Sequence, residues 1–232
     1  MASSGPADPR WPKLLSLTTH EFRTPMTVVA GYIRMLLKER AGPVPDQQRR
    51  LLEEAEKSCA RLSALLGEVS ELSALEGGTA TFNRASVDLR MLLSEAIDGL
   101  PELPDREVRV ELDTEGGPAT VLGDATRLRS ALSSVIAALR RELITSDRLS
   151  VHQRIRQNGT DRISWIAIAD PNRVGGLSTA ADSALTTFDE WRGGCGLSLP
   201  VARRVINAHG GTIWSPLEES RAGAVIALPH QV

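Results

Sequence analysis

The stretch His20-Glu21-Phe22-Arg23-Thr24-Pro25 decides how the rest of this chain is interpreted. We expect it to lie on a helix, because apolar residues continue at helical spacing beyond the proline, at Val28, Val29, Ile33, Leu36 and Leu37. A proline inside a helix removes one N–H donor and displaces the carbonyl four residues earlier, here that of Glu21. The sequence therefore predicts a helix that bends beside His20 and does not end there.

Three side chains of this stretch can act together chemically. The imidazole of His20 is a side chain that can be a neutral nucleophile near neutral pH. The adjacent Glu21 can hold the second ring nitrogen, and the hydroxyl of Thr24 follows one helical turn later on the same face. A single histidine on a helix is usually a solvated or packed residue, so its type alone is weak evidence. We take His20, Glu21 and Thr24 as candidate catalytic residues because all three occur together.

The hexapeptide as a whole resembles the phosphoacceptor motif of sensor histidine kinases, the signal-transduction enzymes of two-component systems. The resemblance implies that His20 carries a phosphoryl group that is exchanged with an aspartate of a response-regulator receiver domain. It also implies that Glu21 orients the imidazole. Thr24 would orient a water molecule that hydrolyses the phosphorylated aspartate.

Composition and charge exclude several other classes of protein. The 232 residues correspond to one or two domains, and the formal net charge is −2 with both signs interspersed. We therefore expect no nucleic-acid partner and no direct membrane contact. Cys59 and Cys195 lack the spacing of a disulfide framework or a metal site, which fits a reducing compartment. We therefore assign no metal ligand. No segment has the apolar length of a membrane span, and we expect a cytoplasmic location.

Two long helices are predicted for the first domain, residues 1–78. The helical pattern runs from Trp11 to Arg40, a turn cluster follows with Asp46 as a candidate N-cap, and a second helix extends from Gln47 to Glu76. The second helix carries an apolar heptad seam at Leu51, Ala55, Ser58, Leu62, Leu65, Val69 and Leu72.

A hairpin of two helices cannot bury this seam alone, because a second apolar row adds Leu52, Cys59 and Leu66. We predict a homodimer in which two hairpins form a four-helix bundle. The alternative is a single hairpin that the rest of the chain covers.

Gly77-Gly78 breaks the second helix, and residues 79–232 then alternate short strands and helices. This order predicts an α/β sandwich with helices packed on one face of a mixed sheet. We expect helices at 88–100, 124–143 and 199–209, and strands at 107–112, 149–156, 163–169, 212–214 and 224–228. Asn158-Gly159 predicts a hairpin turn between two of these strands.

The second domain resembles the ATP-binding domain of the same kinases. The resemblance rests on Asp124-Ala125-Thr126-Arg127-Leu128, Ile166-Ala167-Ile168-Ala169-Asp170, Gly194-Cys195-Gly196-Leu197-Ser198-Leu199 and Ala208-His209-Gly210-Gly211. It implies that Asp170 reads the adenine amino group and that Arg141 contacts a phosphate. The backbone at Gly194, Gly196 and Leu197 would approach the phosphates, since glycines before a helix allow N–H groups to do so.

Two departures weaken the predicted nucleotide site. Aligned on the Asp124 segment, the magnesium-holding asparagine of the family falls on Ala138, and an earlier asparagine falls on Ser134. An alanine has no atom that ligates a metal or a coordinated water. In addition, Asn172 and Val174 stand where the family has glycines.

The third departure is the loss of the mobile lid. Phe188-Asp189-Glu190-Trp191-Arg192 resembles a motif that precedes this lid in the family, but only Gly193 separates it from Gly194. We expect ATP and magnesium to bind weakly or not at all, because phosphoryl transfer depends on metal bridging and on positioning of the phosphates.

Three hypotheses remain for the chain. The first is an ATP-dependent autokinase with an unorthodox nucleotide site, in which Ser134 or Asn172 substitutes for the missing ligand. The second is a phosphotransfer or phosphatase module that acts on a receiver aspartate. The third is a pseudokinase scaffold that binds signalling partners. Because His20, Glu21 and Thr24 are all present, we predict a two-component histidine kinase core that exchanges a phosphoryl group at His20.

Overall fold

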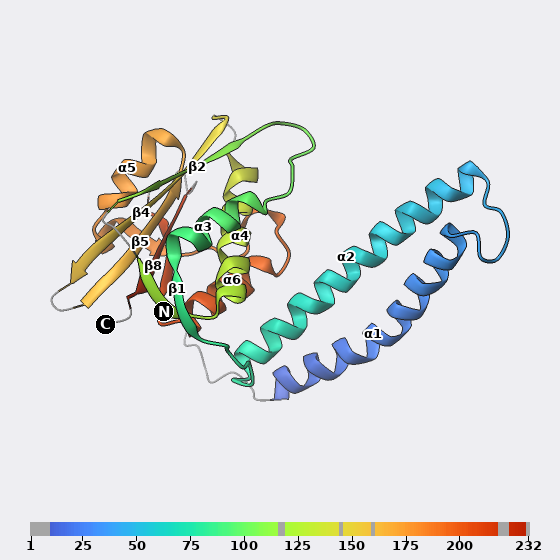
Figure 1. The fold of residues 1–232 in the computed structure, drawn as a ribbon. Coiled ribbons are helices and arrows are strands. Elements are labelled where there is room, and N and C mark those ends of the chain that lie inside the picture. The colour runs from blue at the N-terminus through green and yellow to red at the C-terminus, as the bar shows by residue number, and fades with distance from the viewer. Residues whose placement is uncertain (1–9, 116–118, 144–145, 159–160, 218–222, 231–232) are drawn as a thin grey trace. The chain divides into compact units, whose positions relative to one another are not determined.

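The computed structural model describes residues 10–115, 119–143, 146–158, 161–217 and 223–230 (Figure 1). The chain divides into two compact units, Met1–Ala80 and Thr81–Val232. The predicted division after Gly78 differs from this one by two residues.

The first unit is a hairpin of two long helices, α1 (Arg10–Leu37) and α2 (Asp46–Glu76). Helix α1 continues through Pro25, as the apolar pattern beyond the proline predicted. The prediction that Asp46 is the N-cap of α2 was wrong. Pro45 holds that position, and Asp46 lies in the first turn, where a negative charge still favours the helix dipole.

The backbone hydrogen bonds that follow α1 explain why this helix ends at Leu37 and not at Arg40, as the sequence predicted. Glu39 has a positive φ of 55°, its N–H donates to the carbonyl of Leu36, and the N–H of Arg40 donates to the carbonyl of Met35. This is the Schellman arrangement that ends a helix, here with glutamate in the left-handed position that glycine usually occupies. Arg49 of α2 then donates to the carbonyl of Leu37 at 3.1 Å, which closes the hairpin.

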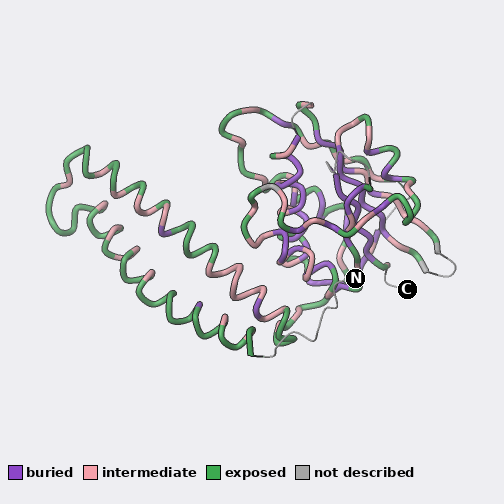
Figure 2. Tube along the Cα trace, turned by 180° about the vertical axis from the view of Figure 1, so that it is seen from behind, coloured by how far each residue is buried: buried purple, intermediate pink, exposed green. Residues whose placement is uncertain are grey.

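The hairpin leaves most of its apolar surface uncovered. Among its described residues only Thr19, Cys59 and Ser73 are buried, and Figure 2 shows both helices as mostly exposed or intermediate. The exposed large apolar side chains are Trp11, Leu14, Leu17, Phe22, Val28, Val29, Tyr32, Met35, Leu36, Leu51, Leu62 and Leu65. None of the described helices combines the length and apolar content that crossing a membrane requires.

The second unit is built on a mixed sheet. Within the described residues this sheet has six strands in the order β2-β4-β5-β8-β7-β6, and β1 and β3 pair separately. The strands are β1 (Ala85–Asp88), β2 (Arg109–Thr114), β3 (Thr120–Gly123), β4 (Arg148–Asn158), β5 (Asp161–Ala169), β6 (Leu185–Thr187), β7 (Thr212–Pro216) and β8 (Ala224–Pro229). Strands β4 and β5 pair antiparallel as predicted, and their turn at Gly159 and Thr160 lies outside the described residues.

Three helices pack on one face of the sheet. They are α3 (Leu89–Asp98), α4 (Ala125–Glu142) and α6 (Ser198–Ala208). Asp88 and Asp124 are the N-caps of α3 and α4, and both accept backbone N–H groups of the first turn. The fully buried side chains of the unit include Leu128, Leu132, Ile136, Ile166, Ile168, Leu199, Ile206, Ile226 and Leu228.

Helix α5 (Pro171–Thr179) lies on the opposite face and was not among the helices that the sequence predicted. Trp165, Ala167 and Ala169 alternate with the core residues of β5 and therefore point to the other side of the sheet. There they form a second apolar cluster with Val174 and Leu177 of α5. Asp170 as N-cap with Pro171 in the first turn is a helix-start signal that the sequence already contained.

Arg156 of β4 fixes the C-terminal end of α5. Its guanidinium lies 3.5 Å from the ring centroid of Trp165 and donates to the carbonyls of Ser178 at 2.6 Å and Ala180 at 2.9 Å. The indole N–H of Trp165 donates to the carbonyl of Leu177 at 3.0 Å. These contacts satisfy carbonyls that the helix end leaves open.

His209 connects α6 to the start of α4. Its Nδ1–H donates to the carbonyl of Val205 at 2.7 Å, and its Nε2 accepts the backbone N–H of Asp124 at 2.9 Å. This pairing requires the neutral imidazole. Burial lowers the pKa of His209, and the hydrogen bond to Val205 only partly opposes this effect.

Acidification should therefore destabilise the second unit through His209. Below about pH 6.5 this histidine binds a proton in the unfolded chain, whereas in the folded chain it stays neutral. The free energy of unfolding therefore decreases as the pH falls from about 6.5 toward the lower pKa of the folded state. Urea unfolding followed by tryptophan fluorescence, at several pH values between about 7.5 and 5.5, measures this slope.

His209→Gln is the matched variant because it cannot ionise in this range. We expect it to lose about 1–3 kcal/mol at neutral pH and to show a smaller pH slope. The pKa of His230 is also lowered by burial, so only the difference between wild type and variant reports on His209. Equal slopes in the two proteins would contradict the prediction.

Candidate functional site

The first candidate site is the exposed face of α1 around His20. The side chains of His20 and Glu21 are 75% and 73% exposed, and His20 Nδ1 lies 3.6 Å from Glu21 Oε1. This distance is longer than a hydrogen bond, and a pair so exposed contributes little to stability. Glu21 is nevertheless the carboxylate beside Nδ1 of His20.

The neighbouring residue explains why His20 faces solvent. Thr19 is buried against α2, and its hydroxyl lies 2.8 Å from the carbonyl of Leu15 and 3.4 Å from the hydroxyl of Ser70. Successive residues of a helix point about 100° apart, so burial of Thr19 turns His20 outward. Thr24 is exposed one turn further on the same face.

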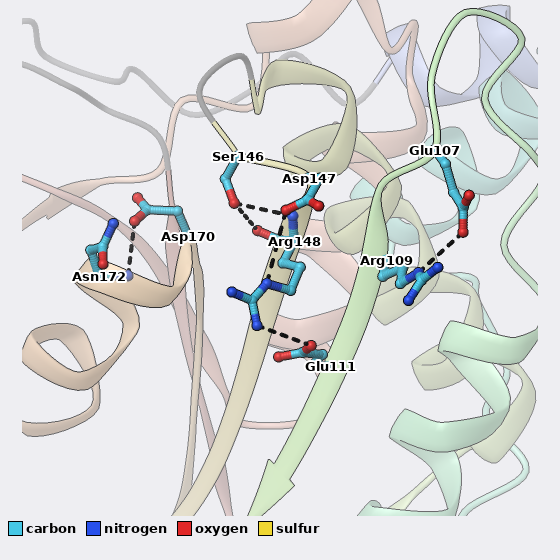
Figure 3. A network of polar contacts seen from close by, with 8 residues as sticks. All are labelled: Glu107, Arg109, Glu111, Ser146, Asp147, Arg148, Asp170 and Asn172. Atoms are coloured by element: carbon cyan, nitrogen blue, oxygen red, sulfur yellow. Dashed lines mark hydrogen bonds and ion pairs between the residues drawn. The ribbon is translucent and has the colours of Figure 1, made fainter.

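The second candidate site comprises the residues that the resemblance assigned to nucleotide binding. Asp170 follows β5, and its Oδ1 accepts the N–H of Asn172 at 3.0 Å, so this carboxylate caps α5 (Figure 3). Figure 3 also shows an ion pair between the neighbouring strands β4 and β2, in which Arg148 lies 3.7 Å from Glu111. Asp170 therefore has a structural role that the sequence prediction did not include.

Gly194, Gly196 and Leu197 lie together before α6. The glycines have positive φ values of 58° and 61°, a conformation that favours glycine, and Leu197 is the N-cap of α6 without a side-chain hydrogen bond. Arg141 is exposed near the end of α4. The backbone conformation before α6 is therefore a structural reason for glycine at these two positions.

The structure offers magnesium no ligand at the position that the family uses. Ala138 is 1% exposed and packs into the core side of α4. Within the part of the chain that is described, no three His, Cys, Asp or Glu side chains are grouped to hold a metal ion. The residues present therefore do not fit a magnesium-bridged nucleotide held in the family's way.

The segment 188–194, which we call the strap, contains charged residues whose roles the sequence prediction missed. Glu190 is buried and accepts from Arg203 at 3.2 Å and from Arg204. Arg192, at the start of the 3-10 helix η2 (Arg192–Gly194), pairs with Glu142. No local sequence signal specifies these pairs, because the partners are separated by 13, 14 and 50 positions.

Comparison with known proteins decides the family. The chain matches the family model of the His Kinase A (phospho-acceptor) domain over residues 13–78, which include the exposed stretch around His20. The chain carries the core of a sensor histidine kinase. This histidine kinase core is 25% identical over 216 residues to the signal transduction histidine-protein kinase BarA of Escherichia coli K12, with 87% of the chain and 22% of the relative covered.

A second relative, the sensor-like histidine kinase SenX3 of Mycobacterium bovis, is 30% identical over 205 residues, with 85% of the chain and 48% of the relative covered. The histidine kinase core thus spans between about a fifth and a half of the curated relatives cited here.

Solved structures show the same fold. The crystal structure of full-length ShkA in complex with AMPPNP aligns with a TM-score of 0.68 at 21% identity, over 94% of the chain and 45% of ShkA. The histidine kinase AdeS of Acinetobacter baumannii aligns with a TM-score of 0.52 at 19% identity, over 91% of the chain and 97% of AdeS. The histidine kinase core therefore combines a phospho-acceptor hairpin with the α/β sandwich of histidine kinase ATP-binding domains.

Proposed function

We propose that this core exchanges a phosphoryl group between His20 and an aspartate of a response-regulator receiver domain. The exposure of His20 on α1, inside the phospho-acceptor match, is the observation that supports this most directly. A receiver domain must bring its aspartyl phosphate in line with the attacking nitrogen, and only an exposed imidazole allows such a large partner to approach.

The proposed transfer proceeds by attack of His20 Nε2 on phosphorus. The N–P bond forms while the bond between phosphorus and the aspartate oxygen breaks, and the carboxylate leaves with the electron pair. The imidazole becomes positively charged, and the neighbouring Glu21 carboxylate stabilises this charge through Nδ1–H. The phosphohistidine product has a high transfer potential, so the reaction can run in both directions.

Thr24 supplies a second route from the same face. Its hydroxyl can accept a hydrogen bond from a water molecule that lies in line with the aspartyl phosphate, which gives free aspartate and inorganic phosphate. Under this proposal the core is a phosphotransferase and a receiver phosphatase.

A radiolabelled receiver domain, phosphorylated by acetyl phosphate, tests the proposal. Added to the full chain without ATP, a cognate receiver should pass label to the chain as an acid-labile phosphoryl group and should lose its own label faster than when incubated alone. Receiver domains encoded in the same genome form the test panel. If none of them transfers label or is dephosphorylated faster, the proposal is wrong and the scaffold hypothesis is favoured.

The proposed active form is a homodimer through the hairpin. The exposed apolar side chains of α1 and α2 greatly outnumber the three buried residues of the hairpin. So many exposed apolar side chains on one hairpin are typical of a protein interface, and a second hairpin would cover them in a four-helix bundle.

For the second unit we propose that ATP binds weakly or not at all and that magnesium changes this little. The buried Ala138, the helix-capping role of Asp170 and the short strap support this proposal. Calorimetric titration of the full chain with AMPPNP is expected to show an affinity no tighter than about millimolar, with or without magnesium. Micromolar binding that requires magnesium would contradict it and would favour the autokinase hypothesis.

A further inference from the structure

The strap, residues 188–194, crosses between the two helices that flank the predicted nucleotide site. Phe188 and Glu190 are buried and Arg192 is half-buried, while Trp191 between the last two is exposed. The backbone turns at Glu190 and Trp191 and then forms the 3-10 helix η2, so the strap is not an extended strand. Its side chains at 188, 190 and 192 nevertheless lie against the protein.

Arg192 attaches the strap to the end of α4. Its Nε lies 3.0 Å from both carboxylate oxygens of Glu142, its Nη2 contacts the same carboxylate, and its Nη1 donates to the carbonyl of Gly223 at 3.2 Å. The two side chains are only 8% and 22% exposed. Such a forked arginine–carboxylate pair fixes direction as well as distance, and either charge left alone in this position is strongly unfavourable.

Glu190 attaches the strap to α6 in the same way with reversed charges. Its buried carboxylate accepts from the guanidinium groups of Arg203 and Arg204. The buried ring of Phe188 anchors the segment between these ion pairs and β6. Three successive inward side chains therefore hold the strap at three points.

We propose that the strap is a built-in closure that keeps the second unit ordered without nucleotide. Glu142 directly follows Arg141, the position that the resemblance assigns to a phosphate contact, so the Arg192–Glu142 pair joins the strap to the same end of α4. In this proposal the carboxylate of Glu142 binds the strap through Arg192, as the phosphates of a nucleotide would otherwise do. The inference rests on the proposed function in one respect only, namely that the second unit does not need a bound nucleotide.

Opening the closure does not recreate a nucleotide site. Without Arg192, the Glu142 carboxylate would stand unpaired beside Arg141 and would repel phosphate groups. Ala138 would still supply no metal ligand. The closure therefore serves to hold one conformation, in place of a lid that opens and closes with each nucleotide.

Hydrogen–deuterium exchange on the full chain without nucleotide tests this inference. We expect the amides of residues 188–194 to be protected in the wild type and to exchange at least about tenfold faster in Glu142→Gln and Arg192→Ala. The double variant Glu142→Arg/Arg192→Glu should recover much of the protection, because it restores the pair with exchanged charges. Arg109→Ala is the matched control, since Arg109 and Glu107 form a pair that is 75% and 78% exposed.

Several results would overturn the inference. These are a wild-type strap that exchanges like an unfolded peptide, unchanged protection in both single variants, a control variant with the same effect, or protection that appears only when magnesium and AMPPNP are added. If Arg192→Ala does not fold, Glu142→Gln still tests the ion pair, because glutamine has the same size as glutamate. Label transfer from a receiver to His20, measured on the same variants, is expected to persist, so failure of the closure is separable from failure of the proposed function.

Discussion

Replacing His20 by alanine should reduce transfer of label from a phosphorylated receiver to this chain to background. The imidazole is the attacking group, and no neighbouring side chain of the exposed face can replace its nitrogen in forming a phosphoramidate. Autoradiography of the separated proteins measures the transfer directly. Circular dichroism should be unchanged, because His20 is exposed and contributes little to packing.

Thr24→Ala separates hydrolysis from transfer. We expect this variant to accept label on His20 normally while loss of phosphate from the receiver slows by up to about 100-fold, since a misplaced water attacks poorly. Glu21→Gln should slow the transfer, because the neutral amide stabilises the charged imidazole less well. Thr18→Ala is the matched control, since Thr18 is an exposed threonine about 200° around the helix from His20.

A pattern in which neither His20→Ala nor Thr24→Ala changes receiver dephosphorylation would show that this face of α1 is not an active site. The pseudokinase scaffold would then explain the chain better, because binding of a receiver does not need either side chain.

A single charged substitution in the heptad seam should dissociate the proposed dimer. Leu62 is exposed in the isolated hairpin and would be buried in a four-helix bundle. Loss of its burial in Leu62→Lys corresponds to about 3–6 kcal/mol per dimer, because symmetry counts the contact twice. The dissociation constant should rise by at least roughly 100-fold.

Sedimentation velocity of the full chain over a concentration series measures this shift. Glu53→Lys is the matched control, since Glu53 is exposed on α2 outside the seam and should leave the dimer intact. A wild-type chain that sediments as a monomer at all concentrations, or equal dissociation in both variants, would exclude the bundle.

Much of the fold was predictable from the sequence because its signals are local. The long helices were predicted to within a few residues of α1 and α2, and the helix predicted at 124–143 agrees with α4 to within one residue at each end. The antiparallel pair β4 and β5 was likewise expected from alternating residues and the Asn158 turn signal. The candidate site on α1 was equally accessible, because His20, Glu21 and Thr24 lie within a single stretch of helix.

Errors arose where a local signal was ambiguous. Asp170 and the residues after it were interpreted as a glycine-type loop through their resemblance to the family, but Asp170 and Pro171 also form a helix-start signal. Glu39 ends α1 in a conformation that favours glycine, so composition alone did not predict the end of that helix.

The sequence by itself determined the periodic helices, the alternating strands and the exposed His20 stretch, because each depends on residues a few positions apart. Only the tertiary structure decided that α5 covers the second face of the sheet and that Arg192 pairs with Glu142, 50 positions away. The reason is physical: a buried ion pair forms only where the fold brings its partners together away from water. No local pattern specifies which of the chain's arginines and carboxylates will meet there.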